Sequence, residues 1–150
     1  MSLKNYREKR NLGVSPEPAG KEEKLERDKR IFVIQKHAAR RLHYDLRLEM
    51  DGVLKSWAVP KEPPRTAGIK RLAVQVEDHP IEYADFEGII PEGHYGAGKV
   101  EIWDKGSYIL KERTDNKIVF ELNGEKLKGT YVLLKFKGDK NWLFFKKKED

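Results

Sequence analysis

The segment from Leu42 to Met50 constrains the fold of this chain more than any other part of the sequence. Within it Tyr, Leu, Leu and Met alternate with His, Asp, Arg and Glu, and a period of two is typical of a β-strand with two different faces. Asp51-Gly52 follows, and this dipeptide favours a tight hairpin because both of its positions need a positive φ. The segment therefore predicts a strand with one apolar and one polar face, paired with a returning strand over 53–59.

The chain after residue 30 continues this β pattern. Short runs rich in Val, Ile, Leu, Tyr, Phe and Trp are separated by Gly, Pro, Asn and Asp. We expect an all-β fold, a single-domain antiparallel β-barrel or sandwich of about eight strands with one or two short flanking helices. The further strands are predicted at 31–36, 71–77, 99–104, 108–110, 118–122, 129–136 and 142–146.

Residues 1–30 differ from the rest and are predicted to form a basic polar N-terminal arm, which leaves 31–150 as the β domain. The arm contains nine Lys or Arg and six acidic residues, and Pro16 and Pro18 oppose regular structure in it. We expect a short helix only over 21–30.

Composition limits the chemistry available to the domain. Lys and Arg outnumber Asp and Glu by 31 to 25, and the net charge of +6 moderately favours polyanionic partners. The absence of cysteine excludes disulfides, zinc ribbons and thiol nucleophiles, so that any metal must be bound by His and carboxylates. No run approaches the roughly 18 apolar residues of a membrane span, and no apolar signal segment is evident. We expect a cytoplasmic monomer with no membrane partner.

The polar face of the strand predicted over 42–50 is a candidate metal site. His43 and Asp45 project from the same strand face with Cα atoms roughly 6.6 Å apart, and a segment short enough to fold back joins them to His37. Two imidazoles and one carboxylate leave coordination positions open, as catalytic sites do, and suit Mn²⁺, Fe²⁺ or Zn²⁺. The same residues also fit an exposed polar face with an ordinary surface ion pair, and the pattern alone leaves both interpretations open.

Two further residues could act on a phosphate beside such a metal. Arg47 continues the same face and carries a planar fork of donors. His79, kept extended by Pro80, could protonate a leaving group, because an unperturbed histidine pKa lies near neutrality; a surface histidine is the alternative. If the strand before His79 runs unbroken, its faces are Arg71, Ala73, Gln75, Glu77 and His79 on one side and Leu72, Val74 and Val76 on the other.

The run from Gly93 to Val100 has the glycine spacing of a phosphate-binding loop but not its other features. Val100 replaces the metal-binding Ser or Thr, Pro91 precedes the run, and β-prone residues follow it. We interpret it as a glycine-rich turn between strands. No G-x-S-x-G elbow or HExxH helix supports serine-hydrolase or zincin chemistry.

Two long stretches carry a resemblance to a known family. FVIQKHAARRLHYDLRLEMDGVLKSWAVPKEPP and RLAVQVEDHPIEYADFEGIIPEGHYGAGKVEIWDKG closely resemble the 3′-phosphoesterase module of bacterial DNA ligase D, and YREKRNLGVSPEP resembles the N-terminal stretch of that module. No ligase or polymerase sequence accompanies them, so the chain looks like a stand-alone relative.

The resemblance implies a Mn²⁺-dependent enzyme of DNA repair, with Zn²⁺, Co²⁺ or another divalent metal as alternatives. Such an enzyme removes a 3′-terminal ribonucleoside and then the remaining 3′-phosphate, leaving a 3′-hydroxyl. Its partners would be DNA 3′ ends or primer-templates, a separate ATP-dependent DNA ligase and other proteins of non-homologous end joining. By motif, His37, His43 and Asp45 are the metal ligands, and Arg47, His79 and Tyr83 engage the scissile phosphate.

Less central site residues are carried over in the same way. Asn11 stands where the family often has Asp, in a part linked to the diesterase step, and His94 stands where the family often has Glu. We expect His94 at the rim of the site with no catalytic role. The remaining candidates are Lys61 and Arg71 for the phosphate, Gln35 for the metal shell, Glu77 for orienting a ligand, and Arg10 and Glu17 in the arm.

Three other functions stay open at this point. The chain could be a non-catalytic nucleic-acid-binding module, a phosphodiesterase acting on cyclic or small-molecule phosphates, or a structural or partner-binding domain. The metal content of the purified protein distinguishes a non-catalytic nucleic-acid-binding module from a metal-dependent enzyme. Substrate competition between nucleotides and DNA ends tests the phosphodiesterase alternative.

Overall fold

The computed structural model describes residues 30–148, so the predicted arm and its helix lie outside the described residues, apart from Arg30, which begins the first strand. No helix within 30–148 has the length and apolar character needed to cross a membrane.

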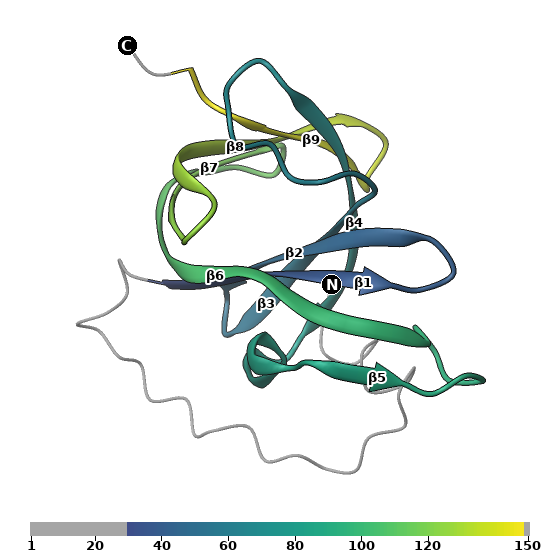
Figure 1. The fold of residues 1–150 in the computed structure, drawn as a ribbon. Helices are drawn as coiled ribbons and strands as arrows, with labels where there is room; N and C mark the ends of the chain where they lie inside the picture. Colours follow the sequence, from purple (N-terminus) through teal and green to yellow (C-terminus); the bar gives the residue numbers. More distant parts are fainter. Residues whose placement is uncertain (1–29, 149–150) are drawn as a thin grey trace.

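The described elements (Figure 1) are β1 (Arg30–Ala38), β2 (Leu42–Met50), β3 (Val53–Val59), β4 (Lys70–His79), the 3-10 helix η2 (Ile81–Asp85), β5 (Gly88–Ile90), β6 (Gly98–Arg113), β7 (Lys117–Asn123), β8 (Lys128–Lys137) and β9 (Asn141–Lys146).

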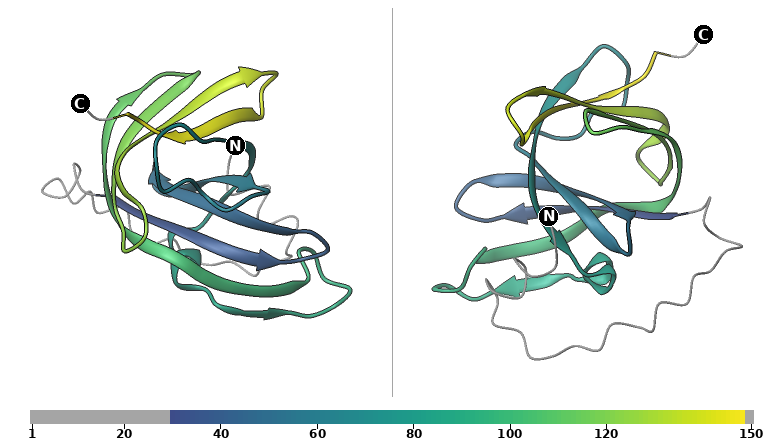
Figure 2. Two further views of the ribbon diagram at one scale, coloured as in Figure 1. Left: turned by 45° about the horizontal axis from the view of Figure 1, so that its top comes forward. Right: turned by 180° about the vertical axis from the view of Figure 1, so that it is seen from behind.

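The strands form one closed antiparallel barrel. Neighbours follow the order β1-β2-β3-β4-β9-β8-β7-β6, and the pairing of β1 with β6 closes the ring of eight, while β5 is added to β6 outside it. The strands curve around a common interior (Figure 2). The predicted all-β barrel is confirmed, and its short helical element is the single 3-10 helix in the described part of the chain.

β6 is longer than the sequence pattern indicated. The strands predicted at 99–104 and 108–110 are one continuous strand, whose first half pairs with β1 and whose second half pairs with β7. Gly106 still pairs with β1 and lies directly before the residues that pair with β7, and a Cβ there would lie 2.1 Å from the Asn123 carbonyl oxygen. Glycine therefore permits the close approach that lets β6 continue instead of ending. The three-residue β5 was not predicted.

The barrel interior is filled by large apolar side chains. Phe120 stacks on Phe144 and on Tyr131, and Trp57 meets Trp142 edge to face. Aromatic rings packed in these orientations add to the stabilisation gained by removing apolar surface from water.

A second and smaller apolar cluster covers the opposite face of β1 and β3. Val33, Leu54 and Ala84 are buried there, with Ile81 packed against them. This cluster holds η2 against the outer face of the barrel wall, on the side away from β7, β8 and β9 (Figure 1). β1 is therefore buried on both faces over residues 32–35, and β2 is likewise buried over residues 44–48.

β4 does not run unbroken. Leu54 pairs with His79 but Ser56 pairs with Val76, so that β4 contains one more residue than β3 over this stretch. The extra residue is a β-bulge, which turns the following side chain to the other face. Val76 and His79 consequently line the same pocket, whereas Ala73 packs in the barrel interior. The prediction of one polar face running from Arg71 to His79 was wrong for this reason.

Candidate active site

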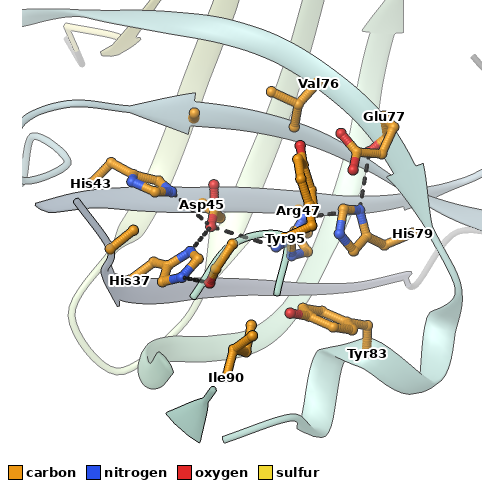
Figure 3. A pocket seen from close by; sticks show the side chains of 13 residues that line it. His37, His43, Asp45, Arg47, Val76, Glu77, His79, Tyr83, Ile90 and Tyr95 are labelled. Carbon is orange, nitrogen blue, oxygen red and sulfur yellow. Dashed lines mark hydrogen bonds and ion pairs between the residues drawn. The ribbon is translucent and has the colours of Figure 1, made fainter. Parts of the chain in front are cut away.

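A pocket of about 220 Å³ opens on the outer face of the barrel wall. Its walls come from β1, β2, β3, β4, η2, β5 and the loop 91–97 (Figure 3). Pockets that enclose a drug-sized ligand usually measure about 300–1,000 Å³. The site therefore has room for an ion and one phosphate group, and a larger substrate must extend beyond its rim.

The three predicted metal ligands converge at one end of this pocket. His37 and His43 are paired across β1 and β2, and Asp45 lies two residues further along β2. Asp45 Oδ2 is 3.6 Å from His37 Nδ1 and 3.3 Å from His43 Nε2. One ligand atom from each residue can be chosen so that all three lie within 4.8 Å of one another. The sequence prediction that these side chains meet is thus confirmed.

Backbone carbonyls fix the orientation of both imidazoles. His37 Nε2 is 2.7 Å from the Gly96 carbonyl oxygen, and His43 Nδ1 is 3.0 Å from that of Arg41. Since a carbonyl oxygen only accepts, these nitrogens carry the hydrogens, and neutral rings keep lone pairs on His37 Nδ1 and His43 Nε2, beside Asp45. Histidines that bind metals are oriented in this way, so the donor set fits a divalent ion such as Mn²⁺ or Zn²⁺.

The charges in the pocket are buried and mutually stabilised. Asp45 is 6% exposed and Arg47 4% exposed, which contradicts the alternative of an exposed surface ion pair. Burial by itself raises the pKa of Asp45, but the Arg47 guanidinium and the rings of His37 and His43 hold that pKa well below its usual range. The hydrogen bond with Asp45 raises the pKa of His43. Asp45 is therefore a permanent anion at the centre of the site.

Arg47 is held rigidly by neighbours on three strands. Its Nε donates to Gln35 Oε1 at 2.6 Å, one terminal nitrogen donates to Ser56 Oγ at 2.9 Å, and the other lies 3.5 Å from Asp45 Oδ2. The Gln35 amide donates in turn to the Tyr83 carbonyl at 2.8 Å. Gln35 thus contacts Arg47, and Arg47 in turn lies beside the predicted metal ligand Asp45. A fixed guanidinium beside the carboxylate suits the binding of a phosphate.

His79 completes the other end of the pocket. Its Nδ1 lies 3.0 Å from the Glu77 carbonyl oxygen and 3.2 Å from an Arg47 terminal nitrogen. Either contact engages Nδ1, so Nε2 is the ring nitrogen that can act on a substrate. The Tyr83 ring meets the His79 ring edge to face at 4.8 Å, and Arg47 lies 4.9 Å from the Tyr83 ring centre. Glu77 is buried and lines the pocket, and its role in orienting a ligand stays a prediction.

Other predicted residues lie away from the pocket lining. Lys61 is exposed beyond β3, and Arg71 donates from Nε to the Glu62 carbonyl at 2.8 Å. His94 is exposed on the loop 91–97 and does not line the pocket. Arg10, Asn11 and Glu17 lie outside the described residues.

Sequence reasoning missed three residues that contribute to the site. Ser56 faces Arg47 across β2 and β3, and Tyr95 lines the pocket while remaining 54% exposed. Gly96 supplies the carbonyl that orients His37, and a Cβ on it would lie 3.5 Å from the His37 ring. Ser56 could have been found from its position opposite Arg47 in the predicted hairpin, whereas no local signal links 95–96 to the metal ligands.

The sequence is similar to a known family and to known proteins. The family described as DNA ligase D 3′-phosphoesterase domain matches residues 35–135. The multifunctional non-homologous end joining protein LigD of Mycolicibacterium smegmatis is 51% identical over 158 aligned positions, which cover 98% of this chain and 21% of the relative. The protein of the same name from Pseudomonas aeruginosa is 47% identical over 156 positions, covering 99% and 19%. The multifunctional non-homologous end joining DNA repair protein LigD of Mycobacterium tuberculosis is 48% identical over 145 positions, covering 94% and 19%.

These relatives differ from the chain in length. The chain spans about a fifth of each relative, so the similarity concerns one part of a larger multifunctional protein. The family match covers well over half of the chain and includes the strands that carry the pocket. This protein belongs to the DNA ligase D 3′-phosphoesterase domain family.

Proposed function

We propose that the protein is a Mn²⁺-dependent 3′-end-healing phosphoesterase, which removes a 3′-terminal ribonucleoside and then the remaining 3′-phosphate to leave a 3′-hydroxyl. The convergence of His37, His43 and Asp45 within one pocket that also contains Arg47 and His79 carries this proposal. The family membership supports the reaction class, since its description names a 3′-phosphoesterase.

The electrostatics of the pocket suit hydrolysis of a phosphate ester. A divalent ion bound by the three ligands supplies positive charge at a phosphoryl oxygen and lowers the pKa of bound water. Asp45 stays ionised over the working pH range because of its depressed pKa. In the neutral form that binding a metal requires, the rings of His37 and His43 present lone pairs toward the same point, because the carbonyls of Gly96 and Arg41 accept the hydrogens on their other ring nitrogens. Little reorganisation is then needed when the ion binds.

Arg47 and His79 are placed to act on the phosphate itself. The Arg47 guanidinium is fixed by Gln35 and Ser56 and does not need to be ordered when a substrate binds. Preorganised donors of this kind stabilise the charge that grows on the phosphoryl oxygens in the transition state. His79, through Nε2, can donate a proton to the departing oxygen, which is general acid catalysis.

The substrate and partners follow from the reaction class. Relatives carry names that include non-homologous end joining and DNA repair, and we propose DNA 3′ ends, presented as primer-templates, as the substrate here. A 3′-hydroxyl is the group that a DNA ligase joins. An ATP-dependent ligase acting after this protein, together with other end-joining proteins, is therefore the proposed partner.

The decisive experiment uses labelled primer-templates that end in a ribonucleotide or in a 3′-phosphate. Purified full-length protein, stripped with EDTA and reloaded with Mn²⁺, Zn²⁺ or Co²⁺, is expected to convert both ends to a 3′-hydroxyl in a metal-dependent way. Conversion of the 3′-phosphate alone would restrict the proposal to the monoesterase step.

Two results would contradict the proposal. Equal activity with and without EDTA would remove the metal from the reaction. Binding of the primer-template without turnover under every metal would favour a non-catalytic nucleic-acid-binding module. A much higher kcat/KM on cyclic or small-molecule phosphates than on DNA ends would assign the pocket to a different substrate.

A further inference from the structure

The turn between β1 and β2 forms the rim of the pocket at its metal end. Ala39 lines the pocket, and the Arg41 carbonyl accepts the hydrogen bond from His43. Arg40 and Arg41 themselves are exposed. Two guanidinium groups therefore stand at the edge of the site, attached to the same turn that orients a predicted metal ligand.

Among the described residues, Arg40 and Arg41 have no acidic partner. No ion pair within residues 30–148 involves Arg40 or Arg41. Some cations elsewhere on the barrel are neutralised locally, as Lys111 is by an acid 3.3 Å away and Lys117 by one 3.9 Å away. The turn consequently keeps a positive potential that an approaching anion encounters.

Tyr83 of η2 also lines the pocket, and acidic residues lie near it in the sequence. η2 and the residues after it present the exposed side chains of Glu82, Asp85 and Glu87. Of these, Asp85 pairs with Lys105, and the Glu87 carboxylate accepts the backbone N–H of Ile102. Because Lys105 neutralises Asp85, Glu82 and Glu87 are the acids that set the charge on the η2 side, and a polyanion is attracted more strongly at the β1–β2 rim.

A nucleic-acid strand must cross one of these rims. The pocket has room for little more than the terminal phosphate, and a DNA strand carries a further phosphate about every 3.4 Å along the helix axis. The phosphates next to the terminal one therefore lie at the rim, within reach of long side chains. Arginine is suited to such contacts because its planar fork can bind two phosphate oxygens at once.

We propose that Arg40 and Arg41 bind the backbone phosphates that precede the 3′ end held in the pocket, so that the strand leaves the site over the β1–β2 turn. This rests on the proposed function and deepens it, because it assigns a direction to the bound strand. The turn then favours the 3′ end of a polymer over a free nucleotide, which lacks the preceding phosphates.

The first test measures binding and does not depend on turnover. Full-length protein in EDTA is titrated with a fluorescent primer-template ending in a 3′-phosphate, and anisotropy gives log K against log salt. Each phosphate contact on duplex DNA contributes a slope of about −0.9, so R40A/R41A should bind with a slope shallower by about 1.8. The matched variant K111A/K117A removes two paired cations and should keep the slope of the unmodified protein. Equal slopes for the unmodified protein and R40A/R41A would overturn the proposal, as would a failure of the unmodified protein to bind this DNA at low salt.

A second test locates the contact along the strand. Neutral methylphosphonate linkages are placed one and two nucleotides before the 3′-phosphate, or eight nucleotides before it as a control. The near substitution is expected to weaken binding by the unmodified protein about tenfold and to have little further effect on R40A/R41A. An equal effect on both proteins would overturn the assigned direction.

Activity measurements separate this proposal from the proposed function. The R40A/R41A variant should lose much more kcat/KM on a long primer-template than on a dinucleotide with a 3′-phosphate. The unmodified protein could prove inactive and still show the arginine-dependent salt slope and the arginine-dependent effect of the methylphosphonates. That result would refute the phosphoesterase function and support the binding surface. If the unmodified protein is active and R40A/R41A loses kcat/KM equally on both substrates, the proposed phosphate contacts of Arg40 and Arg41 are refuted and the proposed function stands.

Discussion

The two faces of β1 and β2 are both buried but contain opposite kinds of residue. Phe32, Ile34 and Leu46 point into the barrel interior, whereas Asp45 and Arg47 point into the pocket. The interior is stabilised by apolar area and close packing, which depend on volume and tolerate exchange between apolar residues. The pocket depends on the distances and orientations of a few hydrogen bonds.

This difference separates stability from chemistry within single strands. A substitution in the interior should change the free energy of unfolding and leave the site of the folded molecules intact. A substitution in the pocket should change metal binding or turnover more than stability, except where it leaves a buried charge without a partner. The following experiments test that separation, beginning with the largest expected effect.

The substitution His43→Ala should abolish metal binding and turnover. It removes one of three ligands, and we expect kcat to fall about 10³-fold or more, equivalent to about 4 kcal/mol of transition-state stabilisation. Mn²⁺ affinity by calorimetry and turnover of a 3′-phosphate primer-template measure the effect. His94→Ala is the matched control, because His94 is exposed and does not line the pocket. Near-normal activity of His43→Ala would contradict the metal assignment.

In the barrel interior, Phe120→Ala should have the converse effect. Phe120 is fully buried and stacks on Phe144, so its truncation is expected to destabilise the protein by about 3–5 kcal/mol. Urea denaturation measures the loss, and Phe136→Ala, at a 52% exposed position, is the control. The folded fraction should still bind Mn²⁺ with the affinity of the unmodified protein. A large loss of metal affinity would show that the two faces are not independent.

The substitution Arg47→Lys should separate charge from geometry in the pocket. Lysine keeps the positive charge beside Asp45 but loses the donors that reach Gln35 and Ser56. We expect Mn²⁺ binding to persist while kcat falls about 10²-fold. Parallel titration of metal and turnover gives both values. Loss of metal binding in this variant would count against a phosphate role for Arg47.

A smaller effect is expected for Ser56→Ala. The substitution leaves Arg47 in place but removes one acceptor at 2.9 Å, and a lost hydrogen bond to a charged group is worth about 1.5–3 kcal/mol. Since two other partners still hold the guanidinium, we expect a decrease in kcat of about tenfold. Ser107→Ala on β6, outside the pocket lining, provides the control. Unchanged kcat would show that Ser56 does not contribute to the orientation of Arg47.

The pH dependence of stability should give the smallest signal, in opposite directions for two residues. The folded-state pKa of Asp45 is lowered from 3.8, so its ionised form stabilises the fold above that value, and this is lost as pH falls through the acid range. The folded-state pKa of His43 is raised from 6.5, so its contribution is present below that value and is lost as pH rises through the raised pKa.

Urea denaturation of EDTA-treated protein between pH 3 and pH 9 measures both contributions. Below about pH 4, Asp45→Asn should lose less free energy of unfolding per pH unit than the unmodified protein, since it lacks the titrating carboxyl. His43→Gln should remove the decline in stability that occurs as pH rises through the raised pKa of His43. Identical profiles for all three proteins would contradict the charge arrangement described for the pocket.

Much of the barrel and the metal end of the pocket could be predicted because their signals are local. The alternation over Leu42–Met50 places His43, Asp45 and Arg47 on one face whatever the rest of the chain does. His37 and His79 were predicted from their neighbouring residues and Tyr83 from the resemblance, and the structure brings these three residues into the same pocket. Lys61 and Arg71, assigned by resemblance alone, do not line it.

Other parts of the site depend on contacts between distant segments and left no readable signal. The bulge that turns His79 into the pocket arises from the register of β4 against β3, which the period of β4 alone does not encode. The Gln35 side chain likewise accepts a hydrogen bond from Arg47 only because β1 and β2 lie side by side in the sheet.

The sequence by itself determined that the chain forms β-strands and that a histidine and a carboxylate share one strand face, because a strand alternates its side chains with a period of two. Only the tertiary structure decided that this face is buried and that the loop carbonyl of Gly96 orients His37 from 59 residues away. Those features depend on closing the barrel and covering its outer wall with η2, and the register and burial that result are properties of the assembled sheet.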